Sequence, residues 1–211
     1  MSATLSIIGA GGHGRVIADS AAQMACWDTI QFYDDLATGA LPGSKWEVVA
    51  TIEAALLHPM STGHSAVVGI GDNRLRLSIQ KQLILAGWHI ATIIHPSAVI
   101  SSGASVESGT VVMANAVVNI GATVGTACIL NTHSSIDHDC ALGAGVHISP
   151  GATLAGGVNV GDRCWIGAGA TLIQGVSVGE DTIVGAGANV IRSLAANVTS
   201  VGNPAKIIKT S

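Results

Sequence analysis

Three of the eight histidines lie within a stretch of fifteen residues, as His133, His138 and His147. An imidazole titrates near neutral pH, so it can take a proton from a reacting group or bind a metal ion. His138 is followed directly by Asp139, and a carboxylate next to an imidazole can orient the ring and stabilise its protonated form. Asp is also common in tight turns, but we interpret this pair as a general base with its orienting group.

The histidines lie inside a repeat with a period of six residues that spans residues 94–190. Every sixth position in it is Ile, Leu or Val. If about one residue in three were of these types, seventeen consecutive matches would be very improbable by chance. The repeated positions are Ile94, Ile100, Val106, Val112, Val118, Val124, Leu130, Ile136, Leu142, Ile148, Leu154, Val160, Ile166, Leu172, Val178, Val184 and Val190.

A small or slim residue follows four positions after each of these aliphatic residues, and Gly, Asn or Asp often precedes it, as suits a tight turn with positive φ. Each hexapeptide is therefore predicted to be a short strand and a turn. Such strands must stack to bury an apolar face, and hexapeptide periodicity indicates a parallel β-helix with eighteen residues per coil. A β-sandwich would show a period of two instead. Cys128, Cys140 and Cys164 fall on the small-residue positions, where a thiol packs as a small hydrophobe.

The composition limits the classes of partner. The chain is 48% hydrophobic and 10% charged, but it has no run of eighteen apolar residues, so we expect no membrane insertion. The net charge of −4 and the lack of basic clusters argue against a nucleic-acid partner. The N-terminal residues show no basic flank or cleavage signal, and we expect a cytoplasmic protein.

The repeat also predicts where side chains point. His138 comes two residues after Ile136, at a turn, so its ring should face outward and be accessible to a substrate. One outward column is mainly apolar, with Ile93, Val111, Ile129, His147, Trp165 and Ile183. An exposed apolar column of this length is typical of a subunit interface. Because His138 lies at the opposite corner, we predict a homotrimer with active sites between subunits, where His138 and His147 converge.

The segment before the repeat is typical of a nucleotide-binding α/β unit. An apolar strand at residues 4–8 leads into the glycine-rich residues 9–14 and a helix at residues 15–24, and a helix N-terminus after such a turn can hold phosphate. A second strand ends at Asp34-Asp35, where a carboxylate commonly takes a ribose hydroxyl. A third strand, at residues 66–70, is followed by Asn73 and Arg74. The candidate substrate-binding residues are Gly11, Gly12, His13, Asp34, Asp35, Asn73 and Arg74.

These features also have a purely structural interpretation, as a tight turn, an N-cap and an exposed arginine. Only about ninety residues precede the repeat, which is too few for a complete dinucleotide fold and suits a nucleoside diphosphate better. We predict a Rossmann-like nucleotide-sugar-binding domain at residues 1–93, a β-helix domain at residues 94–194 and a C-terminal cap at residues 195–211.

The chain resembles the bacterial sugar acetyltransferases of the sialic acid O-acetyltransferase group. It is most similar to the N-acetyltransferases of nucleotide-linked 4-amino sugars, of the UDP-bacillosamine pathway type. The resemblance covers essentially the whole chain. The motifs that carry it are the glycine-rich turn at residues 9–14, Tyr33-Asp34-Asp35, Gly71-Asp72-Asn73-Arg74, Ile136-Asp137-His138-Asp139-Cys140 and Gly202-Asn203-Pro204-Ala205-Lys206.

The resemblance implies a left-handed β-helix, a trimer and an acetyl-CoA-dependent transfer to the 4-amino group of a UDP-linked or, second, a GDP-linked deoxy amino sugar. It implies His138 as catalytic base and Asp139 as its acidic neighbour. It further implies that His147 and Gly156 contact the acetyl end of the cofactor, and we add Trp165 and Lys206 as expected cofactor contacts. No metal is expected.

Other functions remain open at the level of the sequence. The same fold with a hydroxyl acceptor would be a sugar O-acetyltransferase. Some β-helix trimers are zinc carbonic anhydrases that share histidines across an interface, and His133 and His138 are five residues apart; the position where that site would take a further ligand is Ser97 here. A non-catalytic nucleotide-sugar-binding scaffold would leave His138 without a role.

Overall fold

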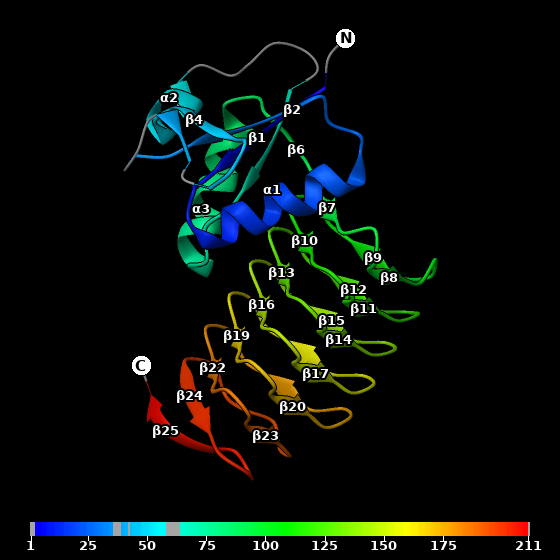
Figure 1. The fold of residues 1–211 in the computed structure, drawn as a ribbon. Helices are drawn as coiled ribbons and strands as arrows, with labels where there is room; N and C mark the ends of the chain where they lie inside the picture. Colours follow the sequence, from blue (N-terminus) through cyan, green and yellow to red (C-terminus); the bar gives the residue numbers. More distant parts are fainter. Residues whose placement is uncertain (1–2, 36–38, 42, 58–63, 211) are drawn as a thin grey trace. The chain divides into compact units, whose positions relative to one another are not determined.

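The chain folds into two units in a computed structural model that describes residues 3–35, 39–41, 43–57 and 64–210. The first unit ends at Pro96 and the second begins at Ser97, three residues after the sequence-based boundary. An α/β unit is followed by a parallel β-helix (Figure 1), so the predicted order of fold classes is confirmed.

The first unit is a six-stranded sheet with helices on both faces. Its strands run in the order β3-β4-β2-β1-β5-β6, and all neighbours are parallel except β3 and β4. This order around β1 is that of a Rossmann-like half. The elements are β1 (Thr4–Ile8), α1 (Gly12–Met24), β2 (Thr29–Tyr33), β3 (Gly39–Ala40), β4 (Glu47–Ala50), α2 (Ile52–Leu57), β5 (His64–Val68), α3 (Asn73–Leu85) and β6 (His89–Ile90).

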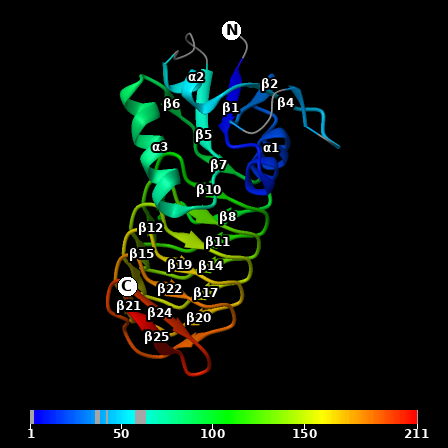
Figure 2. The same ribbon diagram turned by 90° about the vertical axis from the view of Figure 1, so that its left-hand side faces the viewer.

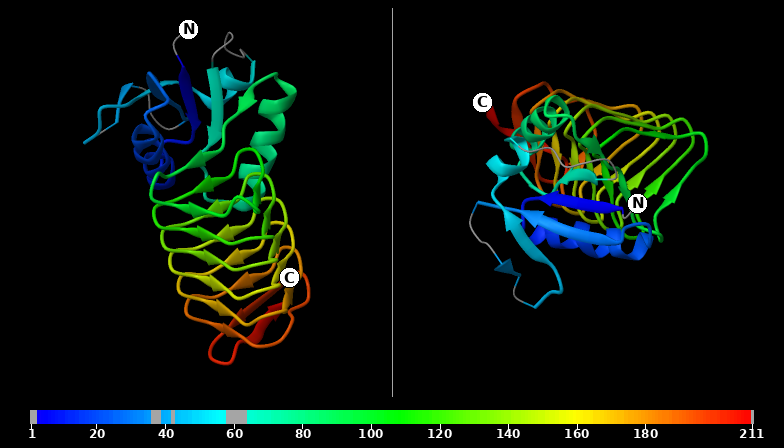
Figure 3. Two further views of the ribbon diagram at one scale, coloured as in Figure 1. Left: turned by 90° about the vertical axis from the view of Figure 1, so that its right-hand side faces the viewer. Right: turned by 90° about the horizontal axis from the view of Figure 1, so that it is seen from above.

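The central strand of this sheet is buried on both faces. All five residues of β1 are buried, as expected for a parallel strand covered on two sides. Ile17 and Ala18 belong to the buried stripe of α1, whereas Ile8 and Val68 pack with Leu83 of α3 in a separate cluster. Figure 3 shows α1 and α3 on opposite sides of the sheet. The longest helices have 13 residues, and in the described ranges no helix is long and apolar enough to cross a membrane.

Helix α1 begins at Gly12, three residues earlier than the predicted start at residue 15. Gly11 is its N-cap, with an extended backbone at φ −67° and ψ −174°. Gly14 is required for packing, because a Cβ there would overlap the carbonyl oxygen of Gly9. The strand predicted at residues 66–70 instead spans His64–Val68, because its pairing with β1 runs from His64 to Val68.

The second unit is a prism with three sheets of short stacked strands (Figure 2). The first sheet contains β10 (Val111–Val112), β13 (Ile129–Leu130), β16 (His147–Ile148), β19 (Trp165–Ile166), β22 (Ile183–Val184), β24 (Val198–Val201) and β25 (Lys206–Thr210). Its outermost strand next to β10 is β7 (Ile93–Ile94), which comes before the boundary at Ser97. The second contains β8 (Val99–Ile100), β11 (Val117–Val118), β14 (Ser135–Ile136), β17 (Thr153–Leu154), β20 (Thr171–Leu172) and β23 (Asn189–Val190). The third contains β9 (Ser105–Val106), β12 (Thr123–Val124), β15 (Ala141–Leu142), β18 (Asn159–Val160) and β21 (Ser177–Val178).

The strand register confirms the predicted coil of eighteen residues. From β8 to β23 the parallel partners are eighteen positions apart, for example Ile129 and His147, or Ser135 and Thr153. The last parallel pair, β22 with β24, has a shorter spacing, with Ile183 opposite Thr199. The repeated aliphatic residues from Val112 to Val190 are all buried, and only the first three, at positions 94, 100 and 106, are half-buried. The small-residue column is also buried from Thr110 onward. The six-residue period therefore defines the prism interior.

The turns recur with the same period in a left-handed backbone conformation. Every sixth residue from Gly109 to Gly187 has a positive φ. Several of them are not glycine, and Ala127, His133 and Arg163 adopt φ of 55°, 58° and 58°. Coil stacking compensates for this local cost. Gly103, six residues before Gly109, does not share this conformation.

The corner cysteines form hydrogen bonds as well as packing contacts. The Sγ atoms of Cys128, Cys140 and Cys164 donate to carbonyl oxygens fifteen residues ahead, at 3.1, 3.2 and 2.9 Å. All three are free thiols, and burial raises the pKa of the Cys164 thiol to about 11. They are therefore neutral donors that connect successive turns.

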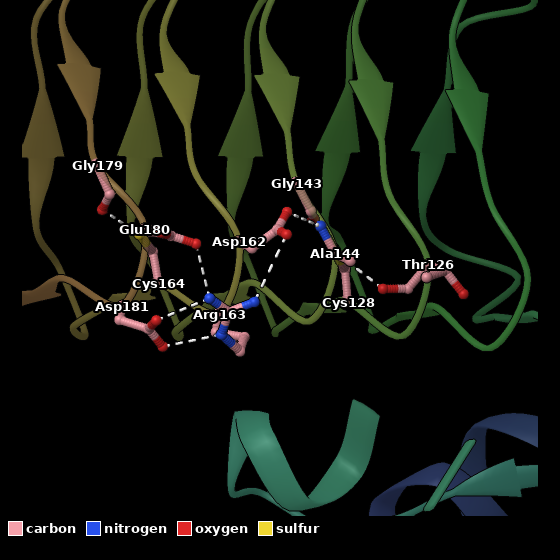
Figure 4. Close-up of polar contacts among 10 residues, drawn as sticks. All are labelled: Thr126, Cys128, Gly143, Ala144, Asp162, Arg163, Cys164, Gly179, Glu180 and Asp181. Atoms are coloured by element: carbon pink, nitrogen blue, oxygen red, sulfur yellow. Dashed lines mark hydrogen bonds and ion pairs between the residues drawn. The ribbon is translucent and has the colours of Figure 1, made fainter. Parts of the chain in front are cut away.

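An ion-pair cluster joins two successive turns at one corner of the prism (Figure 4). Arg163 donates to both carboxylate oxygens of Asp181, at 2.9 and 2.7 Å, and to Glu180 at 2.7 Å. Asp162 lies 3.6 Å from the same guanidinium and accepts from the amide of Ala144 at 2.9 Å. The bidentate hydrogen bonds to Asp181 raise the pKa of Arg163 and fix this turn on the next coil.

The outward apolar column is less exposed than predicted. Ile93, Val111 and Ile129 are 0%, 1% and 0% exposed, so they are already covered in the single chain and are not a free surface. Trp165 and Ile183, at 48% and 42% exposure, remain as the accessible part.

The small-residue column gives a direct test of the prism interior. Ala170 is 0% exposed, so Ala170→Leu should force side chains off their rotamers and lower the free energy of unfolding by about 1–3 kcal/mol. Ala168, two residues earlier, is exposed, and Ala168→Leu should change it little. Urea unfolding followed by circular dichroism measures both. Equal stability of the two variants would contradict the assignment of this column to the interior.

Candidate active site

The turn between β14 and β15 carries the first candidate group. His138 Nδ1 lies 2.8 Å from Oδ2 of Asp139, and both side chains are exposed. A carboxylate can only accept, so Nδ1 carries the hydrogen and the Nε2 lone pair is available to take a proton. Asp139 has a left-handed φ of 59°, and its amide donates to the carbonyl of Ile120 at 3.1 Å. The predicted pair therefore has the geometry of a general base and its orienting group.

A second carboxylate flanks the same imidazole. Asp137 Oδ1 accepts from the His138 amide at 2.8 Å and from Nδ2 of Asn119, one coil earlier, at 2.9 Å. These two hydrogen bonds, that with Asn119 first, lower the pKa of Asp137. The hydrogen bond to Asp139 and then the charge of Asp137 raise the pKa of His138. Two negative groups thus make this imidazole a stronger base.

Gly156 lies one coil beyond His138 and directly against its ring. A Cβ on Gly156 would overlap Nε2 and lie 3.0 Å from Cδ2 of His138, so only glycine leaves room for the imidazole here. Of the three amides in Ala155-Gly156-Gly157, the first donates to the carbonyl of Leu172 and the third to that of His138. Of these three amides, only that of Gly156 has no acceptor within the described chain, so among them it is the one that can donate to a developing oxyanion.

The candidate cofactor residues His147 and Trp165 lie together on the first sheet. Their rings are stacked, with centroids 5.8 Å apart and planes 4° apart. Asn131 Nδ2 donates to His147 Nε2 at 3.3 Å, and Trp165 Nε1 donates to Ser149 Oγ at 2.8 Å. These partners hold both rings in place. Lys206, the remaining candidate, is exposed on β25 of the same sheet.

The two candidate histidines lie on different parts of the prism. His147 is on the first sheet, whereas the His138 turn joins β14 of the second sheet to β15 of the third. In a three-sided prism this corner is opposite the first sheet. One β-helix therefore presents His138 and His147 on opposite sides.

The candidate substrate residues of the first unit gather at one edge of its sheet. Gly11 and Gly12 follow β1, Asp34 and Asp35 follow β2, and Asn73 follows β5, and these three strands are neighbours. The carboxyl ends of adjacent parallel strands form the usual crevice for ligands in such folds. Gly11 and Gly12 are exposed at the start of α1, where anions are favoured.

His13 is half-buried beside this crevice, and its Nε2 has no hydrogen-bond partner within the described chain. Burial first, and then the charge of Arg76, lower its pKa to about 4. A pKa below the ordinary imidazole value means that the ring loses its proton as the pH rises through about 4, so it is neutral at pH 7. His13 can thus offer a hydrogen bond but no charge.

The acidic and polar side chains here already have partners in the fold. Asp34 accepts from the amide of Ala10 at 2.7 Å, and Asp35 accepts from the amide of Ile52 at 2.9 Å, at the start of α2. Asn73 Oδ1 accepts from Arg76 at 2.8 Å. Arg74 is exposed on the first turn of α3. These contacts fix the loops at this edge of the sheet, which is a positioning role in addition to the predicted binding role.

Several residues near the site were absent from the sequence-based candidates. Arg76 is 1% exposed and donates to the carbonyls of Ile70 and Gly71, yet a lone arginine on a helix gives no sequence signal. Asn119 and Asp137 differ by eighteen positions, so the coil length itself would have paired them. Asn131 and Ser149 each lie sixteen positions before their partners, on the adjacent coil.

His133 and His138 point to different partners, which bears on the metal-site alternative. Nε2 of His133 lies 3.4 Å from Nδ2 of Asn115, whereas Nδ1 of His138 contacts Asp139. In the described part of the chain, no group of three or more His, Cys, Asp or Glu side chains is arranged to hold a metal ion.

Comparison with known proteins finds relatives for both units. Residues 4–83 match the family model of the PglD N-terminal domain, and residues 157–192 match that of the bacterial transferase hexapeptide (six repeats). A curated protein of Bacillus subtilis (strain 168), UDP-N-acetylbacillosamine N-acetyltransferase, is 34% identical over 106 residues, which are 50% of this chain and 49% of that protein.

Two solved structures align with nearly the whole chain. The acetyltransferase domain of PglB from Neisseria gonorrhoeae FA1090, in complex with acetyl coenzyme A, is 39% identical, with 99% of this chain and 100% of that chain covered and a TM-score of 0.94. PerB from Caulobacter crescentus, in complex with CoA and GDP-perosamine, is 40% identical. The alignment covers 98% of this chain and 97% of that chain, with a TM-score of 0.91.

Removing the Asp139 charge should change the titration of His138. Asp139→Asn loses the charged hydrogen bond that raises the pKa of His138, so this pKa should fall and the ring should be neutral down to a lower pH. Asp181 occupies an equivalent left-handed turn but holds Arg163, so Asp181→Asn should leave the His138 pKa unchanged. Histidine NMR titration measures both, and an unchanged pKa in Asp139→Asn would refute the pairing.

Proposed function

Because this chain belongs to the hexapeptide-repeat sugar acetyltransferases that carry a PglD-type N-terminal domain, we propose that it transfers acetyl from acetyl-CoA to the 4-amino group of a nucleotide-linked deoxy amino sugar. The nucleotide is UDP or, as second choice, GDP. The observation that carries this proposal is the arrangement of the His138 ring. Asp139 holds its Nδ1, and its Nε2 is free and lies next to Gly156.

The reaction is a direct transfer assisted by a general base. As the sugar amine attacks the thioester carbonyl, a C–N bond forms and Nε2 of His138 accepts the proton that the nitrogen loses. The Gly156 N–H donates to the oxyanion of the tetrahedral intermediate. The C–S bond then breaks, and the imidazolium can return its proton to the departing thiolate. Asp139 stabilises the imidazolium during these steps, and no covalent enzyme intermediate is needed.

The first unit would bind the nucleotide part of the acceptor. Gly11 and Gly12 offer free helix N-terminal amides for a phosphate, and the exposed Arg74 adds a positive charge. Neutral His13 has a hydrogen-bonding nitrogen available. Asp34, Asp35 and Asn73 shape the crevice by their contacts with the backbone and with Arg76. An amine acceptor is favoured over a hydroxyl because the B. subtilis relative is a bacillosamine N-acetyltransferase and the PerB structure contains GDP-perosamine.

We propose that the active enzyme is a homotrimer. His138 and His147 occupy opposite sides of one prism, so a site that uses both must combine two copies. Trp165 and Ile183 leave an exposed apolar patch on the first sheet, which a second copy would cover. In that arrangement His147, Trp165 and Lys206 of one subunit bind acetyl-CoA facing His138 of another. The cytoplasm is the proposed location, since acetyl-CoA and nucleotide sugars are found there.

His138→Ala tests the catalytic assignment. Loss of the general base should lower kcat by about 10²–10⁴-fold, while the oligomeric state should be unchanged because the apolar patch of Trp165 and Ile183 is left intact. His133→Ala is the matched control, since His133 is also an exposed histidine in a left-handed turn, and its kcat should be close to that of the unsubstituted chain. Release of free CoA thiol measures both rates. Full activity of His138→Ala would sink the assignment.

Ile183→Glu tests the trimer. A charge at the centre of a buried apolar interface should dissociate the subunits and abolish activity. Leu85→Glu changes an apolar residue that is 88% exposed in the first unit and should remain a fully active trimer. Sedimentation velocity and the thiol assay are the two measurements. A monomer that keeps full activity would contradict the proposal.

A further inference from the structure

The turn one coil before the catalytic turn contains a gap that the Asp139 carboxylate fills. Gly121 is eighteen positions before Asp139 and has a φ of 74°. A Cβ on Gly121 would overlap Oδ1 of Asp139 and lie 3.3 Å from its Cγ. The carboxylate that binds His138 through Oδ2 therefore has its other oxygen directly over the Gly121 backbone.

The backbone conformation alone does not explain a glycine at this position. Ala127 follows at the next step of the turn series and has a Cβ at a φ of 55°, so the fold accepts alanine in this type of turn. Gly157, Gly175 and Gly187 share the left-handed φ, but nothing lies within 4 Å of a Cβ built on any of them. At Gly121, by contrast, the space that a side chain would occupy is filled by the Asp139 carboxylate.

We propose that Gly121 is a positioning residue for the catalytic base, because it leaves the space in which Asp139 holds Nδ1 of His138. This inference rests on the proposed role of His138. Together with Gly156, it places a glycine on each side of the pair: Gly121 one coil before Asp139, and Gly156 one coil after His138.

The effect of a substitution at Gly121 depends on which atom the new Cβ would displace. The Cβ of Gly121→Ala overlaps only the end of a flexible, exposed side chain, and its distance of 3.5 Å from the backbone nitrogen of Asp139 is an ordinary van der Waals contact. The carboxylate can rotate away toward solvent at little cost to the fold. It then leaves Nδ1 of His138, so the expected effect falls on the base and not on stability.

The matched control is Gly187→Ala. Gly187 occupies the same step of the hexapeptide, at a φ of 65° and in open space. Both variants therefore carry a similar backbone penalty, and only Gly121→Ala displaces the carboxylate. The melting temperatures of the two variants should agree.

The first readout is the pKa of His138 from NMR titration. The carboxylates that face this imidazole are Asp139 and Asp137, and Gly121→Ala moves only the first. The His138 pKa should fall toward its value in Asp139→Asn, whereas Gly187→Ala should keep the original value. This readout does not depend on activity, so it tests the placement even if His138→Ala shows that His138 is not the base.

The second readout is a double-mutant cycle on the acetyl-transfer rate. Gly121→Ala should lower kcat about tenfold with little change in KM for acetyl-CoA, as expected when a base loses its orientation. In the Asp139→Asn background the same substitution should have no further effect, because it acts through that carboxylate. A His138 pKa equal to that of Gly187→Ala, or an undiminished effect of Gly121→Ala in the Asp139→Asn background, would overturn the proposal.

Discussion

Backbone hydrogen bonds between parallel coils are the constraint on which the rest of this structure depends. They place each residue of the prism over the one eighteen positions earlier, so residues far apart in the sequence become neighbours along a column. The aliphatic and small-residue columns supply the apolar burial that stabilises the stack. The outer surface is then free to vary, and the site is built there. His138 and Asp139 are two turn residues whose side chains lie close against Gly156 and Gly121, respectively, on the adjacent coils.

The same constraint separates the groups that the chemistry must combine. A corner and the sheet opposite to it cannot meet within one prism, so in the proposed trimer the aromatic pair of His147 and Trp165 would face the base of a neighbouring subunit. The electrostatics are local by comparison. Two carboxylates raise the pKa of His138, whereas burial lowers that of His13 to about 4. One histidine is therefore suited to accept a proton near neutral pH, and the other is suited to hydrogen bonding without charge.

Much of the fold was predictable because its period is visible in the sequence. The interior column from Val112 onward and the strand Thr4–Ile8 followed from pattern alone. The pairing of His138 with Asp139 was also predictable, since the two are adjacent. The contacts of Arg76 and the burial of Val111 were not, because they depend on tertiary packing, which leaves no periodic signal. The role of Gly121 was hidden for another reason: glycine is already expected in a turn, so its second purpose appears only when the neighbouring coil is in place.

The central claim is that an amine nitrogen of a nucleotide-linked sugar attacks the acetyl thioester at this site. The most direct measurement is product analysis after incubation with acetyl-CoA and UDP- or GDP-linked 4-amino deoxy sugars, each paired with its 4-hydroxy counterpart. We predict that mass spectrometry finds one added acetyl group on an amino sugar and that NMR places it on the 4-nitrogen as an amide, with the hydroxy counterpart unchanged. An acetyl group on a sugar oxygen, or acetylation of the hydroxy compounds alone, would contradict the account.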